Sequence, residues 1–300
     1  MRVHAVRDLP AAATGKRPSR PDRGGREEIR RRDAPVTLEH RFEDGWFFRR
    51  RSAARPRGTL VWIHGLGESG LCFERIAAHP EFRRFDQLIP DLPGYGRSPW
   101  PARPERLERL ALAAALWVEA RAATPPVIWL GHSMGGVLAT LAAERRPRAV
   151  QAVVDIDGNI TSGDCTFSGR AASRSRAAFL RGGLEELRRA VHRKGVRDEA
   201  LRGYAASLAF ADPASFYRHS VDLVRLSRDG SLARRLAALG IPVLYVAGSP
   251  GGACPRSLAA LRREGVPVAV VAPAGHWPFV DAPDEFAAAV AAFLRDAASG

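Results

Sequence analysis

The sequence predicts an α/β protein in which helices cover both faces of a mostly parallel sheet. Short apolar runs alternate along the chain with longer segments whose apolar residues recur at helical spacing. Several of the short runs are apolar throughout, as in parallel strands that are buried on both faces. One of them leads into a Gly-X-Ser-X-Gly pentad and then into a helical segment, so strand, sharp turn and helix follow one another there.

Composition limits the class of protein. The 300 residues, 46% of them hydrophobic, suit one large domain with a substantial core. No apolar run reaches membrane-spanning length, and the N-terminus lacks the apolar segment of a signal peptide. Cys72, Cys165 and Cys254 are odd in number and lack metal-ligand spacing, which is typical of free thiols in a reducing compartment. We therefore expect a cytoplasmic protein with no metal, no cofactor and no membrane partner.

The net charge of +14 comes almost wholly from arginine, since Lys16 and Lys194 are the only lysines. The arginines are spread along the chain among alanine, glycine and proline. Charge of this kind governs solubility and nonspecific binding rather than chemistry, so we expect no nucleic-acid partner. The sequence gives no indication of the oligomeric state.

Residues 1–33 carry arginine, proline and glycine without sustained periodicity. We expect this segment to be a disordered basic tail outside the fold. A basic arm for an acidic partner and translation from an upstream start are the alternatives.

The first elements of the fold are a hairpin and a buried strand. Residues 36–42 and 46–49 are strand-like runs on either side of Glu43-Asp44-Gly45, and an Asp-Gly turn between such runs predicts a hairpin. Residues 59–63 form a continuous apolar strand that ends in His64-Gly65-Leu66-Gly67-Glu68-Ser69. Glycines in this loop let a backbone amide approach a ligand closely, and the amide of Leu66 is placed to stabilise negative charge. We expect His64 to be a structural hydrogen-bonding residue.

The remaining elements continue the alternation. Residues 104–123 predict a helix because Leu107, Leu110, Ala114 and Trp117 recur on one face. Another helix is predicted around residues 71–78, and a last one begins near residues 283–286. Further strands are predicted at residues 87–91, 125–130, 150–156, 243–247 and 268–271.

The pentad Gly131-His132-Ser133-Met134-Gly135 lies between the strand at residues 125–130 and an Ala/Leu-rich helical segment that runs to Pro147. Small residues are needed at Gly131 and Gly135 because a serine on such a strained turn has its backbone pressed against its neighbours. The turn exposes the Ser133 hydroxyl above the strand end. It also leaves the Met134 amide at the start of a helix, where it can donate to a developing negative charge.

Four motifs, in this order, resemble those of the α/β-hydrolase superfamily over residues 36–294. The resemblance implies an α/β-hydrolase fold with an eight-stranded sheet, a Ser–acid–His triad, and an oxyanion hole from the amides of Leu66 and Met134. It also implies a helical cap between the sixth and seventh strands. We place this cap at residues 161–239, between core segments 34–160 and 240–300. The motifs are His64-Gly65-Leu66-Gly67, Asp91-Leu92-Pro93-Gly94-Tyr95-Gly96-Arg97-Ser98, Gly131-His132-Ser133-Met134-Gly135-Gly136 and Gly275-His276-Trp277-Pro278-Phe279.

His276 is the expected general base. A serine hydroxyl is a poor nucleophile unless a neighbouring imidazole takes its proton, so a histidine that reaches Ser133 is chemically required. His276 follows the last predicted strand by a few residues, in the position that the resemblance gives to the triad histidine.

The triad acid departs from the common pattern of the superfamily. The usual position lies shortly after Gly248, but no acidic residue occurs between there and Glu264. A second position used in this superfamily is the end of strand six, where Asp157 closes the run from Val153. We expect Asp157 to orient His276. Asp155 is the next alternative but lies deeper on the same side of the strand, and an acid from the cap or a broken triad are the others.

The expected activity is a serine hydrolase that cleaves a carboxylic ester or related acyl bond through an acyl-enzyme on Ser133, with a small-molecule acyl substrate. Relatives that form an alkyl-ester intermediate use an aspartate at this position, so their chemistry is excluded. Acyl transfer, thioester cleavage and carbon–carbon bond hydrolysis use the same triad and stay open. A ligand-binding protein without catalysis is the alternative from another class.

Overall fold

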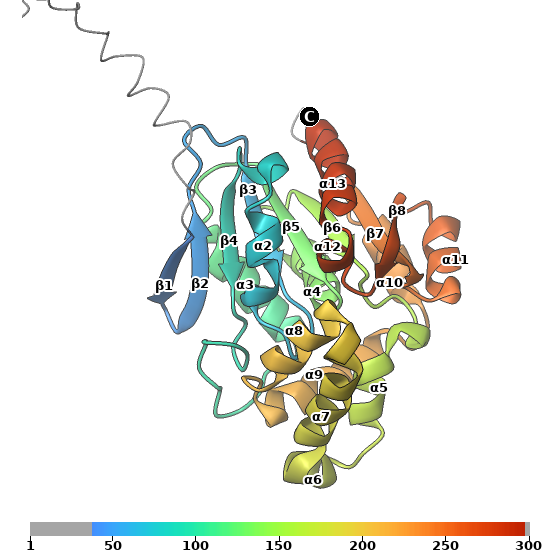
Figure 1. Ribbon diagram of the computed structural model, residues 1–300. Helices are drawn as coiled ribbons and strands as arrows, with labels where there is room; N and C mark the ends of the chain where they lie inside the picture. The colour runs from blue at the N-terminus through green and yellow to red at the C-terminus, as the bar shows by residue number, and fades with distance from the viewer. Residues whose placement is uncertain (1–37, 298–300) are drawn as a thin grey trace, which may run out of the picture. The chain divides into compact units, whose positions relative to one another are not determined.

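An eight-stranded sheet forms the centre of the structure, a computed structural model in which residues 38–297 are described (Figure 1). The strand order is β1-β2-β4-β3-β5-β6-β7-β8. β1 and β2 pair antiparallel, β2 pairs antiparallel with β4, and the other neighbours are parallel. The predicted fold class is therefore confirmed. The strands are β1 (Glu39–Glu43), β2 (Trp46–Arg51), β3 (Thr59–Ile63), β4 (Asp86–Pro90), β5 (Val127–His132), β6 (Ala152–Ile156), β7 (Val243–Gly251) and β8 (Val268–Gly275).

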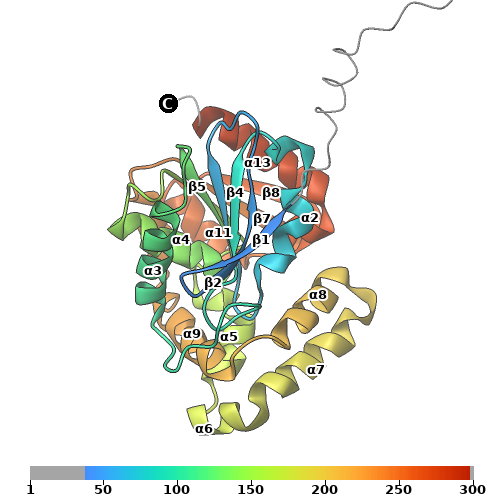
Figure 2. The same cartoon turned by 90° about the vertical axis from the view of Figure 1, so that its left-hand side faces the viewer.

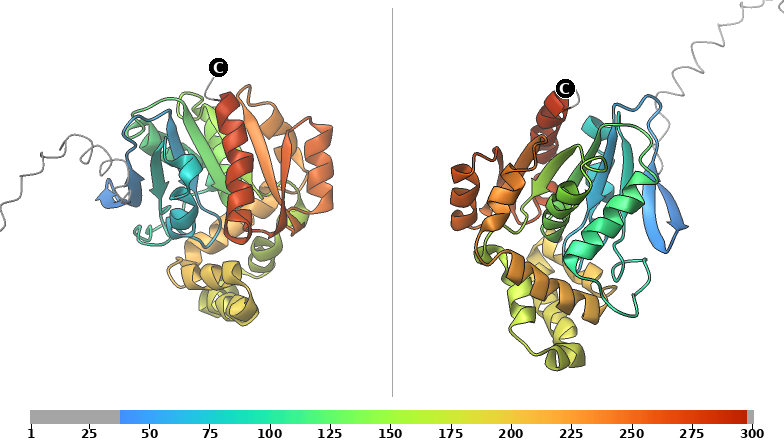
Figure 3. Two further views of the ribbon diagram at one scale, coloured as in Figure 1. Left: turned by 45° about the horizontal axis from the view of Figure 1, so that its top comes forward. Right: turned by 180° about the vertical axis from the view of Figure 1, so that it is seen from behind.

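Helices cover both faces of this sheet. Figure 2 shows the sheet nearly edge-on, with α3 and α4 on one side and α2 on the other, and Figure 3 shows α13 on the same face as α2. The helix expected over residues 71–78 is a 3-10 turn, Gly70–Phe73, that runs into a single α-helical turn; its first amide is tied to the buried Asp91 carboxylate (2.7 Å). The core helices are α2 (Glu74–Ala77), α3 (Leu107–Glu119), α4 (Met134–Arg145), α11 (Pro255–Arg263), α12 (Pro278–Asp281) and α13 (Pro283–Ala297).

The segment between β6 and β7 is helical and lies at the end of the sheet where the parallel strands finish (Figures 1 and 2). The helix α10 (Ser231–Ala237) differs from the rest because it packs beside α4 and α11, and Arg235 pairs with Glu144 of α4 at 2.6 Å. The helices over the strand ends are α5 (Thr166–Ala172), α6 (Arg176–Ala178), α7 (Leu184–Lys194), α8 (Glu199–Leu208) and α9 (Pro213–Leu226).

The expected hairpin is present as β1 and β2. Asp44 and Gly45 join the strands with φ of 50° and 76°, the left-handed conformation that a two-residue hairpin turn requires. Cys72, Cys165 and Cys254 are free thiols. The basic segment at residues 1–33 lies outside the described residues. None of the helices within residues 38–297 has the length and apolar character needed to cross a membrane.

Candidate active site

Ser133 occupies a strained turn between β5 and α4. Its φ of 54° and ψ of −115° lie in a region that residues with a side chain rarely adopt. The Ser133 amide donates to the carbonyl of Ile156 (2.9 Å), which ties the turn to the end of β6. A Cβ on Gly135 would lie 2.0 Å from the carbonyl oxygen of Ile63, so only glycine fits there. The turn therefore holds Ser133 at the carboxyl ends of the central strands.

Ser133 and His276 line the same cavity, whose volume is about 20 Å³. His276 directly follows β8, and Trp277 separates it from α12. Phe167 of α5 and Tyr204 of α8 close the cavity from the side of the inserted helices. The Trp277 ring packs against both Tyr204 and His276, with centroids 5.4 and 5.0 Å apart. The structure thus brings the two expected triad partners to one cavity that residues of the inserted helices help to line.

Asp157 lies beside His276. It follows β6 directly, has a φ of 48°, and its side chain is fully buried. The amide of Ala253 donates to Asp157 Oδ1 (2.8 Å), whereas Oδ2 has no hydrogen-bond partner. That unpartnered oxygen lies 3.7 Å from Nδ1 of His276. The separation is an ion-pair distance but too long for a hydrogen bond, and such contacts in substrate-free sites are often long and tighten when substrate binds.

The loop after β7, where the superfamily usually carries its acid, wraps around Asp157 instead. β7 continues through Gly248 to Gly251, and the next two residues lie against the Asp157 carboxylate. A Cβ on Gly252 would be 2.4 Å from Asp157 Oδ2, and the Ala253 amide donates to the other oxygen. The loop therefore supplies backbone to the carboxylate in place of a carboxylate of its own.

Asp155, the alternative acid, has different surroundings. It lies within β6 and is 1% exposed, and burial raises the pKa of its carboxyl well above the usual range. One of its oxygens has no hydrogen-bond partner. The carboxylate contact of His276 is made with Asp157, two residues further along the chain. Asp155 is therefore a buried carboxyl inside the sheet with a raised pKa.

The two expected oxyanion donors follow the ends of the neighbouring strands β3 and β5. Leu66 lines the same cavity as Ser133 and His276, in the loop after β3. Met134 is the first residue of α4, so its amide has no acceptor within the helix. Both amides belong to segments that the β3–β5 pairing places side by side.

A buried polar cluster beneath the cavity was not predicted from the sequence. Glu68 is 2% exposed and lies between His132 and Trp277. His132 Nδ1 is 2.9 Å from Glu68 Oε2, and its Nε2 is 2.8 Å from the carbonyl oxygen of His276. His132 lies inside the Gly-X-Ser-X-Gly pentad and Glu68 directly follows the His64-Gly65-Leu66-Gly67 motif, where the prediction rested on the glycines and the serine. The sequence signal that could have identified Glu68 is its position five residues after the end of an apolar strand, at Ile63.

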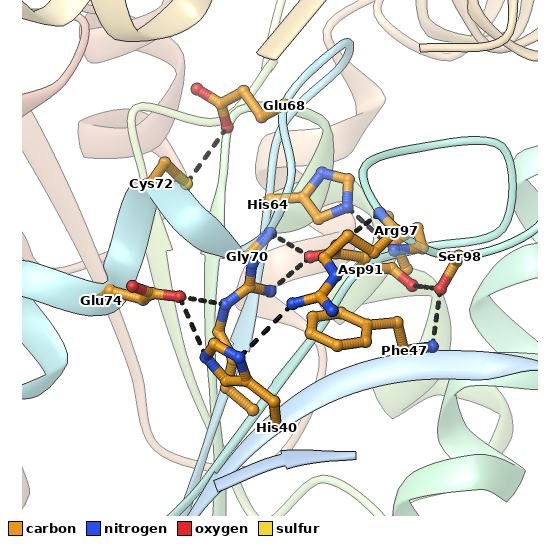
Figure 4. Close-up of polar contacts among 12 residues, drawn as sticks. His40, Phe47, His64, Glu68, Gly70, Cys72, Glu74, Asp91, Arg97 and Ser98 are labelled. Atoms are coloured by element: carbon orange, nitrogen blue, oxygen red, sulfur yellow. Dashed lines mark hydrogen bonds and ion pairs between the residues drawn. The ribbon is translucent and has the colours of Figure 1, made fainter. Parts of the chain in front are cut away.

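The Asp91 motif is structural. The buried Asp91 carboxylate accepts from Arg49 (2.6 Å) and from the amides of Gly70 and Arg97 (2.7 and 2.8 Å) (Figure 4). Arg49 also pairs with Glu74. This arrangement fixes the loop after β4 against β2 and the turn before α2, and it supports the wall of the site without lining it.

Comparisons with known proteins agree with this architecture. Residues 60–289 match the Alpha/beta hydrolase family. A pimeloyl-[acyl-carrier protein] methyl ester esterase of Serratia marcescens is 29% identical over 252 residues, which cover 78% of this chain and 93% of that protein. A similar esterase of Pectobacterium carotovorum is 28% identical and covers 79% of this chain and 94% of its own.

Solved structures share the fold at lower sequence identity. A thermophilic esterase from Thermogutta terrifontis superposes with a TM-score of 0.67 at 20% identity, over 87% of this chain and 98% of that one. The enol-lactonase from Burkholderia xenovorans LB400 gives a TM-score of 0.64 at 19% identity, over 86% and 100%. From its motifs, its sheet and the match over residues 60–289, the chain belongs to the alpha/beta hydrolase family.

Proposed function

We propose that the chain is a serine hydrolase of carboxylic esters in which Ser133, His276 and Asp157 form the triad. The Ser133 hydroxyl attacks the ester carbonyl while His276 takes its proton, and the alcohol leaves with that proton. Water then attacks the acyl-enzyme by the same route and releases the acid. Two observations together carry the proposal. Ser133 and His276 line the same cavity, and the buried Asp157 oxygen lies 3.7 Å from the His276 imidazole.

Asp157 is the acid of this proposal because its unpartnered oxygen faces the imidazole. A carboxylate at Nδ1 fixes the tautomer that leaves Nε2 free for the serine, and it stabilises the imidazolium that forms in the reaction. The Ala253 amide holds the other oxygen and so fixes the direction of the carboxylate. Asp155 is less suited to the role because it lies within β6, whereas the contact of His276 is with Asp157, and burial raises the pKa of Asp155.

The amides of Leu66 and Met134 are the proposed oxyanion donors. Negative charge develops on the carbonyl oxygen when Ser133 attacks, and backbone amides aimed at that oxygen stabilise it without reorganisation. Leu66 lines the cavity, and Met134 opens α4, whose positive helix end faces the same side.

The helices α5 to α9 are the proposed cap. The cavity of about 20 Å³ beside Ser133 holds roughly one water molecule, which is less room than an acyl group needs, and one of its walls is aromatic. The aromatic residues Phe167, Tyr204 and Trp277 form that wall, with ring centroids 4.9 to 6.4 Å apart. The relatives are named as methyl ester esterases, which favours esters of small alcohols as substrates.

The test is hydrolysis of a matched series that shares one acyl group and differs in the bond cleaved: methyl ester, butyl ester, thioester and amide. The proposal expects the highest kcat/KM for the esters, and no turnover of any member by Ser133→Ala. A thioester preferred by tenfold or more overturns the ester assignment. Turnover by Ser133→Ala overturns the nucleophile.

A further inference from the structure

Two buried histidines flank the loop that carries Leu66, and their hydrogen bonds indicate that one ring is neutral and the other is protonated. The amide of Leu92 donates to His64 Nε2 (2.9 Å), so that nitrogen carries no proton (Figure 4). The proton is therefore on Nδ1, which donates to the carbonyl oxygen of Gly65 (2.9 Å). Burial lowers the pKa of His64, in agreement with a neutral ring.

His132 faces oxygen acceptors on both ring nitrogens. Nδ1 is 2.9 Å from the Glu68 carboxylate, and Nε2 is 2.8 Å from the carbonyl oxygen of His276. A neutral imidazole has one N–H and satisfies one of these acceptors, whereas an imidazolium satisfies both. Burial alone would lower the pKa of His132, but the charge and hydrogen bond of Glu68 outweigh it and raise the pKa.

Glu68 is held as a carboxylate by converging donors. The Gly65 amide donates to Oε2 (2.6 Å), as does His132, and the indole N–H of Trp277 donates to Oε1. Burial would raise the pKa of Glu68, but His132 and these hydrogen bonds lower it to about 2.

The other titratable groups that face this pair come from four elements. The Cys72 thiol lies 3.9 Å from Glu68 Oε2, and the charge of Glu68 adds to the burial that raises the pKa of Tyr204. Asp157 contributes to the raised pKa of His132, and the His276 ring centroid lies 4.7 Å from that of His132. The positive charge that balances Glu68 is therefore assigned to His132.

We propose that neutral His64 and the Glu68–His132 ion pair are positioning residues for the oxyanion donor and the general base. The Gly65 carbonyl and the Leu66 N–H belong to one planar trans peptide, so their directions are opposed. The hydrogen bond from His64 fixes that carbonyl and thereby orients the Leu66 N–H. Glu68 fixes the preceding peptide by accepting from the Gly65 amide. Protonated His132 holds the backbone of His276. This inference rests on the proposed function of Leu66, Ser133 and His276.

The direct test is nitrogen-15 NMR of the full-length chain with labelled histidine rings, each ring assigned through its own backbone. At pH 7.5, where an exposed histidine is mostly neutral, His132 should show two protonated ring nitrogens and His64 one. A single proton on His132, or an imidazolium at His64, overturns the inference. This readout does not depend on turnover. If Ser133→Ala proved active, the proposed function would fail, but the protonation states of His64 and His132 could still be measured.

Kinetics of variants test the positioning role. Asn at position 64 places an amide N–H near the position of Nδ1, whereas Leu offers no donor. We expect His64→Leu to lower kcat on the order of 10²-fold, as for a misplaced catalytic group, and His64→Asn to recover part of it, with KM nearly unchanged in both. Equal kcat in the two variants contradicts the role of His64.

Glu68→Gln keeps the size of the side chain and removes its charge. The NMR spectrum of this variant should show His132 with one ring proton fewer, and kcat should fall. Glu185→Gln, on the exposed face of α7, is the matched control and should leave both unchanged. An unchanged His132 ring in Glu68→Gln overturns the ion pair.

Discussion

Asp155 and Asp157 lie two positions apart, yet their surroundings differ. Asp155 is buried within β6, where burial raises its pKa, while Asp157 meets the Ala253 amide with one oxygen and His276 with the other. Sequence alone ranked them by depth along the strand. The contacts that distinguish Asp157 from Asp155 are made by residues 252, 253 and 276, which are distant in the chain.

Asparagine at each position gives the sharpest comparison of the two acids. Asp157→Asn should slow turnover by up to ~10⁴-fold, since neutralising a triad carboxylate removes the group that fixes the tautomer. Asp155 lies within β6 and is not the partner of His276, so Asp155→Asn should cost far less. Steady-state kinetics with melting temperatures checks both. If Asp155→Asn lost activity while Asp157→Asn kept it, Asp155 and not Asp157 would be the triad acid.

The Glu68–His132 pair predicts how stability depends on pH. The pKa of Glu68 is lowered to about 2, so its contribution is present above the unfolded value of about 4.3 and is lost as pH falls toward 2. The pKa of His132 is raised, so its contribution is present below about 6.5 and is lost as pH rises through the folded value. Melting temperatures of wild type and Glu68→Gln should therefore differ most between about pH 4.3 and 6.5. A difference independent of pH would contradict the ion pair.

At the scale of elements, the sequence predicted where strands begin better than where they end. β7 and β8 were expected to end at residues 247 and 271, but both continue, and Pro250 pairs with Ala274 and Gly251 with Gly275. Glycine and proline disfavour strands locally, so the extension is a tertiary effect that no local pattern shows. This extended pair carries both the loop around Asp157 and His276, so the part of the site that was hardest to predict depends on it.

The loop after β7 should tolerate no side chain at Gly252. A Cβ there meets Asp157 Oδ2 at 2.4 Å, so Gly252→Ala should displace the carboxylate or the loop and reduce kcat. Gly169→Ala in α5 is the control, because its Cβ meets nothing closer than 3.9 Å. Kinetic constants and melting temperatures of both variants check this. Wild-type kcat in Gly252→Ala would show that the carboxylate direction is unimportant.

At the scale of the whole molecule, the order of four motifs was enough to predict the sheet, the family and the position of the inserted helices. Motif order succeeds because each motif closes a strand, and parallel strands bring their carboxyl ends to one edge. The Glu68–His132–Trp277 cluster escaped prediction because its three residues come from three segments that are distant in the chain, and only the folded chain brings them together.

Removal of residues 1–33 should leave activity and melting temperature nearly unchanged. The segment has too few apolar residues to contribute to a core. Comparison of the full chain with a chain that starts at residue 34 tests this by calorimetry and ester hydrolysis. A large loss of stability would show that the segment packs on the fold.

The central claim is that Ser133 is the nucleophile of an acyl-enzyme. The most direct measurement is mass spectrometry of the protein after reaction with a fluorophosphonate ester, followed by mapping of the modified peptide. The account predicts one adduct, on Ser133, that is absent in Ser133→Ala together with a loss of roughly 10³-fold or more in kcat. An adduct on another residue, or turnover near the wild-type rate in Ser133→Ala, would contradict it.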